Sequence, residues 1–402
     1  MKNSKFLEEK YGLKETVKGA FSDKIAREKQ LEWWVDREEE LEKWKYIIEH
    51  SLSTNKNYIV FIIGSYGRGK TLSLLKVKKE AMKYKAILPI YLNFKGEEKS
   101  KPGLDFILRI FKNIDFDKIR EDKTDKEVKS AIENIPVTFE EPKKILNIIY
   151  FGKTGKLRYK PLFENESVQK REGKSEDSKL ALFFLRGEIK PTTPQLKELE
   201  IIRKMENIDI TKEYLAAVLY FIKNLRYKTL LLSVDEFEYL FSLVSKPQQS
   251  IYLAVLRSLY DFPSGVNVKP EDIVNMVFFI AISEDGWDRL KVMEKREMHQ
   301  GGPIRPLIRR IDGETVLGRF DKEQSRKLII VRLRYNRKKG KFEDNPLIPF
   351  TEDFVDYIHG VTEGEPSKIV VRCGHVLDKG LAERVPLLTR EFAERVLEER
   401  TF

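Results

Sequence analysis

The sequence predicts an α/β fold around a parallel β-sheet, chiefly because of three apolar runs. Residues 58–63 (YIVFII), 86–94 (AILPIYLNF) and 229–234 (TLLLSV) are β-prone and have the length of buried strands. Residues 72–77 and 211–227, beside the first and third runs, carry apolar residues at helical spacing. Strand, helix and strand in this order form right-handed βαβ units, so we expect the strands to be parallel.

A Gly-rich loop joins the first strand to its helix. Residues 64–71 read GSYGRGKT, the pattern Gly-x-x-x-x-Gly-Lys-Thr of a phosphate-binding loop (P-loop). Glycines let backbone N–H groups face phosphate oxygens, and the helix N-terminus adds partial positive charge. Lys70 would reach the β- and γ-phosphates, and the Thr71 hydroxyl would bind Mg²⁺. A plain connecting turn is the alternative, which both flanks disfavour. The predicted nucleotide-binding residues here are Gly64, Ser65, Tyr66, Gly67, Arg68, Gly69, Lys70, Thr71 and Leu72.

Hydrolysis needs a second strand that ends in carboxylates, and residues 229–236 supply it. The apolar run is followed directly by Asp235 and Glu236. Asp235 would hold Mg²⁺ through water, and Glu236 would polarise the attacking water as general base. Two acids at a strand end are common by themselves, but their pairing with an upstream P-loop predicts an ATPase with ATP and Mg²⁺ as cofactors.

A further apolar run, residues 276–283 (MVFFIAIS), ends in Ser283. A hydroxyl at the tip of a strand between the P-loop strand and the Asp-Glu strand would orient the attacking water. A serine that caps the following segment is an equally weighted alternative. Further along, Arg305, Arg309 and Arg310 crowd one short region, and residues 321–333 have the pattern of a helix.

Composition restricts the class of protein. The 402 residues allow two or three domains, and the one cysteine, Cys373, excludes an intrachain disulfide. The N-terminus lacks a signal-peptide pattern and no apolar run has the length of a membrane span, so we expect a cytoplasmic protein with no membrane partner. The net charge of +11 fits a nucleic-acid partner, but both signs are mixed throughout, and a solvated surface is as well supported.

The residue pattern divides the chain into four parts. Residues 1–50 are expected to be mostly helical. Residues 51–320 form the α/β core, interrupted at about 96–210 by a helical insertion with a mobile loop near 164–179. Residues 321–402 are expected to form a helical lid, with no strand-rich winged-helix module among them.

The order of these motifs resembles that of AAA+ ATPases, in particular the branch of archaeal and eukaryotic origin-recognition initiators and STAND-like archaeal ATPases. VDREEELEKW (35–44) is similar to the box before the P-loop that helps to form the adenine pocket, which implicates Val35. Asn93 stands where this branch has a polar switch residue, and Ser283 stands at sensor 1. PLIRRI (306–311) resembles the arginine-finger region, which implicates Arg309 and Arg310, with a slight preference for Arg310. Pairing of both arginines with acids of their own subunit is the alternative.

The sensor 2 turn of the same family resembles VTEGEPSKIV (361–370). Ser367 occupies the place of the usual Arg, so Lys368 or Arg372 is the expected substitute. Because a winged helix is not expected, DNA contacts would come from the insertion, the Arg305–Arg310 loop or RLRYNRKKGK (332–341).

Two local patterns refine the prediction. Residues 181–240, with their long helix and the DEFEYL ending, are similar to ATP-binding proteins of BREX phage-defence systems and their archaeal relatives, although Leu185-Arg186-Gly187 lacks the family's Trp. In the box before the P-loop, Asp36 is expected to be the N-cap of a helix, with Glu39 completing a capping box.

Together these features predict an ATPase that couples ATP binding and hydrolysis to assembly on DNA, or to remodelling of DNA or a DNA-bound partner, in replication, mobile-element maintenance or phage defence. A homo-oligomer is expected because the arginine finger would act in trans. The alternative is a STAND-type switch that hydrolyses slowly and acts through protein partners. A scaffold that keeps ATP as a structural ligand is a third interpretation, which the presence of Glu236 disfavours.

Overall fold

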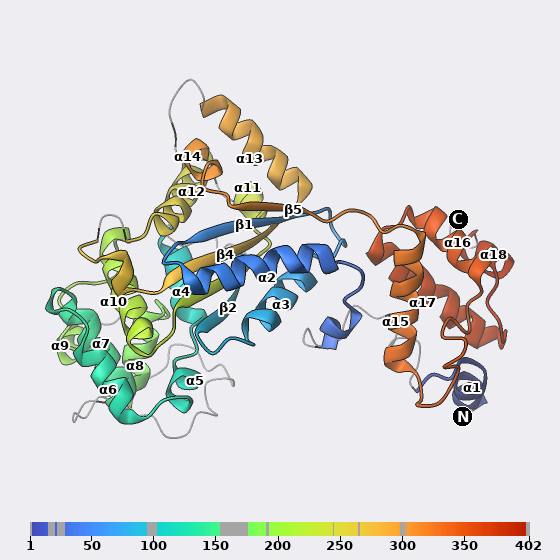
Figure 1. Ribbon diagram of the computed structural model, residues 1–402, viewed down its shortest axis with the longest axis horizontal. Coiled ribbons are helices and arrows are strands. Elements are labelled where there is room, and N and C mark those ends of the chain that lie inside the picture. Colours follow the sequence, from blue (N-terminus) through green and yellow to red (C-terminus); the bar gives the residue numbers. More distant parts are fainter. Residues whose placement is uncertain are drawn as a thin grey trace.

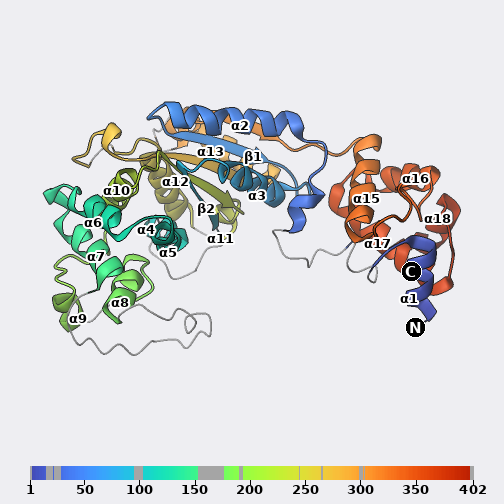
Figure 2. The ribbon, with the colours of Figure 1, turned by 60° about the horizontal axis from the view of Figure 1, so that its bottom comes forward.

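The chain forms an α/β core with a helical insertion at one end and a C-terminal helical unit at the other (Figure 1 and Figure 2). None of the described helices combines the length and the hydropathy needed to cross a membrane. The computed structural model describes residues 2–14, 21, 29–94, 103–152, 176–189, 193–243, 245–263, 266–297, 302 and 304–398.

A five-stranded parallel sheet lies at the centre of the core, which confirms the predicted fold class. Its spatial order is β2-β3-β4-β1-β5, so β4 separates the P-loop strand β1 from β3, as predicted. The strands are β1 (Tyr58–Ile63), β2 (Ile87–Asn93), β3 (Thr229–Asp235), β4 (Asn275–Ile282) and β5 (Gly313–Val316).

Strand β5 is absent from the sequence prediction. Its four residues, GETV, contain no apolar run, and alternate residues of the strand are exposed to different degrees. Pairing with the buried strand β1 places them in the sheet, with Val60 opposite Gly313 and Ile63 opposite Val316. Because this pairing partner is distant in sequence, the local pattern does not reveal the strand.

The inner strands are buried on both faces, which explains their continuous apolar runs. Ile59 and Phe61 of β1 belong to the large hydrophobic cluster on one face. Val60 and Ile62 of the same strand belong to the cluster on the opposite face. Successive side chains of a strand point to opposite faces, so both faces need covering helices.

Helices cover both faces of the sheet (Figure 1). Trp44 of α2 (Glu38–Ser53) and Leu74 of α3 (Lys70–Ala81) pack in the cluster on one face. The helices that contribute to the cluster on the other face are α10 (Ile208–Asn224), α11 (Tyr239–Leu243), α12 (Lys246–Tyr260), α13 (Glu284–Glu297) and α14 (Ile304–Ile308), with η4 (Pro270–Asp272) leading into β4.

The insertion between β2 and α10 is helical, as predicted, and shares the large hydrophobic cluster of the core. Phe106 contacts Phe94, at the end of β2, with 5.8 Å between ring centroids. Residues 164–175 of the expected mobile loop lie outside the described residues, whereas residues 176–179 belong to a helix. The elements are α4 (Leu104–Asn113), α5 (Phe116–Glu121), α6 (Asp125–Glu133), η3 (Val137–Phe139), α7 (Glu140–Phe151), α8 (Glu176–Leu185) and α9 (Thr193–Glu198).

The C-terminal helical unit, called the lid below, has its own hydrophobic cluster, and the N-terminal elements pack into it (Figure 1). Leu7 and Tyr11 are buried there, and the Tyr11 hydroxyl donates to the carbonyl of Val385 at 2.6 Å. The domain boundaries stay a prediction. The elements are α1 (Lys2–Phe6), η1 (Leu7–Tyr11), η2 (Lys29–Trp33), α15 (Lys322–Asn336), α16 (Glu352–Thr362), α17 (Pro366–Glu383) and α18 (Arg390–Glu398).

The prediction that Asp36 caps α2 is wrong. Arg37 is the N-cap residue and makes no side-chain cap, while Asp36 has a left-handed φ of 52°. Three glutamates in the first turn of α2 complement its dipole instead. The Asp36 carboxylate accepts a hydrogen bond from Lys327 of α15 at 3.0 Å, so this residue joins the segment before α2 to the lid.

Candidate functional site

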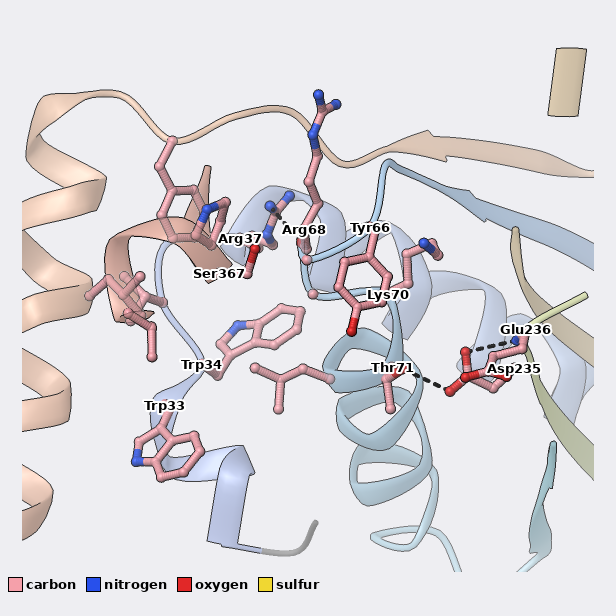
Figure 3. A pocket seen from close by; sticks show the side chains of 18 of the residues that line it. Trp33, Trp34, Arg37, Tyr66, Arg68, Lys70, Thr71, Asp235, Glu236 and Ser367 are labelled. Carbon is pink, nitrogen blue, oxygen red and sulfur yellow. Dashed lines mark hydrogen bonds between the residues drawn. The ribbon is translucent and has the colours of Figure 1, made fainter. Parts of the chain in front are cut away.

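A cavity of about 730 Å³ lies between the core and the lid (Figure 3). Its walls come from the P-loop, the end of β3, the segment before α2 and the lid helices α15 and α17. The lining residues are Trp33, Trp34, Val35, Arg37, Tyr66, Gly67, Arg68, Gly69, Lys70, Thr71, Leu72, Asp235, Glu236, Glu238, Tyr239, Phe320, Leu328, Arg332, Pro366, Ser367 and Val370.

The P-loop has the backbone that its glycines predict. Gly67 and Gly69 have φ values of 83° and 91°, in the left-handed region that L side chains rarely adopt. Gly69 is the N-cap of α3, whose first residue is Lys70. The Lys70 ammonium donates to the carbonyls of Gly64 at 2.8 Å and Ser65 at 3.4 Å. These backbone acceptors hold the cation inside the loop, where phosphate oxygens would replace them.

The two motifs predicted from the sequence meet at one hydrogen bond (Figure 3). The Thr71 hydroxyl donates to Asp235 Oδ2 at 2.8 Å, and the Tyr91 hydroxyl donates to the same oxygen. A hydroxyl beside a carboxylate is the donor set that suits Mg²⁺ in a nucleotide site, where phosphates and water supply the other oxygens. Thr71 and Asp235 therefore fit the predicted metal-binding role.

Glu236 sits on a strained turn at the tip of β3. Its φ of 57° is unusual for a residue with a side chain, and its N–H donates to Asp235 Oδ1 at 2.9 Å. The conformation directs the chain away from the strand, so Asp235 is buried while Glu236 is half-buried and lines the cavity. Such strain is concentrated at functional sites in proteins.

A second carboxylate, Glu238, faces the cavity and escaped the sequence analysis. Its Oε1 lies 4.0 Å from the Lys70 ammonium, and its buried Oε2 has no hydrogen-bond partner among the described residues. Desolvation raises the pKa of the Glu238 carboxyl above its ordinary value, against the opposing effect of Lys70. The DEFE sequence contains a signal for Glu238. Residues 236 and 238 flank one buried residue, Phe237, so their side chains can both face away from the core.

Asn93 and Ser283 lie at the same sheet edge but make different contacts. Asn93 is opposite Asp235 in the β2–β3 register, and its carbonyl accepts from Arg109 at 2.8 Å. The Ser283 hydroxyl accepts from the N–H of Gly286 at 3.1 Å, in the first turn of α13. The structure thus places Ser283 as a cap of the following helix, the alternative that its sequence position left open.

Not all of the remaining predicted residues lie at the cavity. Val35 is buried and lines the cavity, whereas Lys368 and Arg372 are exposed on α17 and do not line it. Arg309 is exposed after α14. Arg310 is engaged within its own chain, since it donates to Asp261 at 2.6 Å and to the Pro306 carbonyl at 2.6 Å.

One basic residue proposed for DNA contact has a structural role instead. Arg337 is buried and donates to the carbonyls of Pro346 at 2.9 Å and Ile348 at 2.6 Å. Desolvation lowers the pKa of its guanidinium to about 10. In the same stretch Lys338 pairs with Glu8, so the exposed cations there are Arg334, Lys339 and Lys341.

Two aromatic residues before α2 form a wall that the sequence analysis missed (Figure 3). The indole N–H groups of Trp33 and Trp34 are buried without hydrogen-bond partners among the described residues. The guanidinium of Arg332, on α15, lies 3.6 Å from the centroid of the Trp33 ring. A flat, apolar wall with unused donors suits a planar, polar ring such as a nucleobase.

Comparisons with known proteins give structural similarity at low sequence identity. No protein-family model matches the chain, and no curated protein is similar to it in sequence. Cdc6p from Pyrobaculum aerophilum has a TM-score of 0.48 and 11% identity, covering 96% of this chain and 71% of that chain. The Aeropyrum pernix Orc1 protein in complex with DNA has a TM-score of 0.46 and 12% identity, covering 96% and 69%. Drosophila ORC bound to DNA has a TM-score of 0.43 and 13% identity, covering 99% and 74%. These values do not assign the chain to a family.

Lys70→Ala should weaken binding of Mg²⁺·ATP by roughly 100-fold, because a hydrogen bond to a charged group is worth up to about 3 kcal/mol. Isothermal titration calorimetry measures the affinity. Lys79→Ala, which removes an exposed cation from the same helix, is the matched control and should keep the parental affinity. Equal affinities of the two variants would show that the P-loop does not hold the phosphates.

Proposed function

We propose that this chain is a P-loop ATPase of the AAA+ type that binds Mg²⁺·ATP between its core and its lid and hydrolyses it. The observation that carries the proposal is the convergence of Lys70 and Thr71 with Asp235 and Glu236 around one cavity, from two strands separated by β4. A turn that merely joined β1 to α3 would need none of these partners.

Each residue has a distinct proposed role. Lys70 would exchange its two carbonyl partners for the β- and γ-phosphates, and the P-loop N–H groups would surround the phosphate oxygens. Thr71 and Asp235 would hold Mg²⁺, which supplies positive charge next to the phosphates. Glu236 would accept a proton from the attacking water, with Asn93 as a polar neighbour on the adjacent strand.

The nucleobase would lie against the segment before α2. Val35 and Trp34 line the cavity on that side, and Leu328 and Val370 of the lid line it as well. A base held by both parts would connect nucleotide binding to lid position, because both parts would contact the same ligand. This is the physical basis on which ATP state would control assembly of the chain on DNA or on a DNA-bound partner.

A STAND-type switch is the second candidate function, and two observations favour it. The Ser283 hydroxyl is used to cap α13, and neither Lys368 nor Arg372 lines the cavity. Both features would reduce transition-state stabilisation and so slow hydrolysis. Steady-state ATPase activity with and without DNA separates the two functions. Stimulation by DNA supports the DNA-coupled ATPase, whereas slow turnover that DNA leaves unchanged supports the switch.

Glu236→Gln should keep ATP bound and lower turnover by roughly 10²-fold or more, the usual effect of losing a general base. Glu238→Gln is the informative comparison, because this carboxylate also faces the cavity. We expect Glu238→Gln to retain most of the turnover. A larger loss for Glu238→Gln than for Glu236→Gln in a phosphate-release assay would transfer the base role to Glu238.

Arg309→Ala should lower turnover by about 10³-fold while ATP binding is unchanged, if Arg309 acts on the ATP of a neighbouring subunit. Mixing this variant with Glu236→Gln should restore part of the activity, since a mixed interface combines an intact Arg309 with an intact Glu236. Arg296→Ala, which removes another exposed arginine, is the control and should be active alone. Hetero-oligomers without any rescue would exclude the trans role. Arg310→Ala should lower stability instead, because Asp261 loses its 2.6 Å hydrogen bond from Arg310 and keeps only the longer contact with Arg257.

Binding to duplex DNA should weaken linearly with the logarithm of salt concentration. Lys339→Ala/Lys341→Ala should reduce the slope by roughly 0.9 for each phosphate that the two lysines neutralise in the parent. Lys43→Ala/Lys79→Ala removes the same charge from the core helices and should leave the slope unchanged. Fluorescence anisotropy with labelled duplex measures these slopes. Absence of binding at low salt would support the protein-directed switch.

A further inference from the structure

A short linker, residues 317–320, joins β5 to the first lid helix and is attached to the P-loop. The N–H of Leu317 donates to the carbonyl of Ile63, immediately before the P-loop, at 2.7 Å. Arg68, within the P-loop, donates to the Leu317 carbonyl at 3.3 Å. Arg37 donates to the carbonyls of both Arg68 and Gly318, at 3.2 Å and 3.3 Å. Movement of the P-loop is therefore transmitted directly to the start of the lid connection.

The far end of the linker is attached to the turn before α17. The N–H of Phe320 donates to the carbonyl of Gly364 at 2.8 Å. A Cβ at Gly364, whose φ is 69°, would lie 2.0 Å from the Phe320 carbonyl oxygen, so the contact requires glycine. Ser367, in the first turn of α17, approaches Gly67 so closely that a Cβ there would lie 2.1 Å from its Oγ. The lid turn and the P-loop thus touch each other directly as well as through the linker.

Arg68 lies at the centre of this contact, between two carboxylates. Its guanidinium donates to Glu284 of α13 at 2.5 Å, and the same carboxylate accepts from Ser65 at 2.5 Å. Its Nε lies 3.7 Å from Glu365 Oε2, at the N-cap of α17. Arg68 Nε and Glu365 Oε1 are both buried without a hydrogen-bond partner among the described residues. A small approach of the lid would let the Arg68 Nε–H donate to the Glu365 carboxylate.

We propose that Arg68 and Glu365 form a latch that closes when nucleotide binds, and that this ion pair couples P-loop occupancy to lid position. The coupling rests on the proposed nucleotide site. Binding would draw Lys70 away from the carbonyls of Gly64 and Ser65, which reshapes the loop that carries Arg68. The pair would then perform from the P-loop side the lid-sensing role for which position 367 offers only a serine. Arg68 and Glu365 are positioning residues in this proposal.

Pulsed electron–electron spin resonance tests the latch, with spin labels on Tyr46→Cys in α2 and Val371→Cys in α17. Both sites are exposed, and the native Cys373 is buried and will not be labelled. A non-hydrolysable ATP analogue with Mg²⁺ should shift and narrow the core-to-lid distance distribution of the parent. Arg68→Ala, Glu365→Gln and the double variant should each lose most of this shift, and to the same extent, because one pair is broken in all three.

Glu365→Gln separates loss of the latch from loss of a direct nucleotide contact, because residue 365 does not line the cavity. It should weaken binding of the analogue about tenfold, within the usual range of coupling between sites. Arg326→Ala, which breaks an arginine–carboxylate pair inside the lid, is the matched control and should change neither readout. A parental shift in Arg68→Ala, or parental affinity in Glu365→Gln, would overturn the latch. Failure of the parent to bind the analogue would instead overturn the proposed function, and with it the latch that rests on that function.

Discussion

Parallel pairing of β1 and β3 to the shared strand β4 is the constraint on which the site depends. The register aligns the ends of the three strands, with Ile63 opposite Ile282 and Val234 opposite Ile280. The chain leaves β1 as the P-loop and leaves β3 as Asp235-Glu236 at this same edge. The hydrogen bond from Thr71 to Asp235 follows from this alignment. A slip of one residue would turn every side chain to the opposite face and separate the two motifs.

The lid is held to the core by contacts that also shape the P-loop. Arg37 is buried, lies 5.2 Å from the centroid of the Phe320 ring, and donates to carbonyls of the P-loop and the linker. Burial lowers the pKa of its guanidinium, yet a guanidinium stays charged at neutral pH and can serve several acceptors from one fork. Arg37 therefore connects the cavity wall to the P-loop and to the linker that leads into the first lid helix.

Some of the basic side chains have structural roles. Arg337 satisfies two carbonyls inside the lid, Arg310 pairs with Asp261, and Arg37 supports the linker. Burial does not reduce the net charge of +11, however, because the described residues bury more carboxylates than arginines. Lys339 and Lys341, on the exposed turn after α15, are among the cations whose charge faces solvent. The net charge of a protein indicates a binding partner only after its buried and paired charges have been considered.

The sequence by itself determined four of the five described strands, the P-loop and the Asp-Glu pair, because buried parallel strands are continuous apolar runs and phosphate binding demands specific residues in a fixed order. It did not reveal β5 or the Asp36–Lys327 contact, since both depend on partners far along the chain. The sequence likewise did not predict that Glu284, Glu365 and Arg37 lie next to the P-loop. Their position around the P-loop was decided by the tertiary structure. Pairing of β1 with β4 places Glu284 beside the P-loop, and the linker that packs against β1 brings the lid with Glu365 to it.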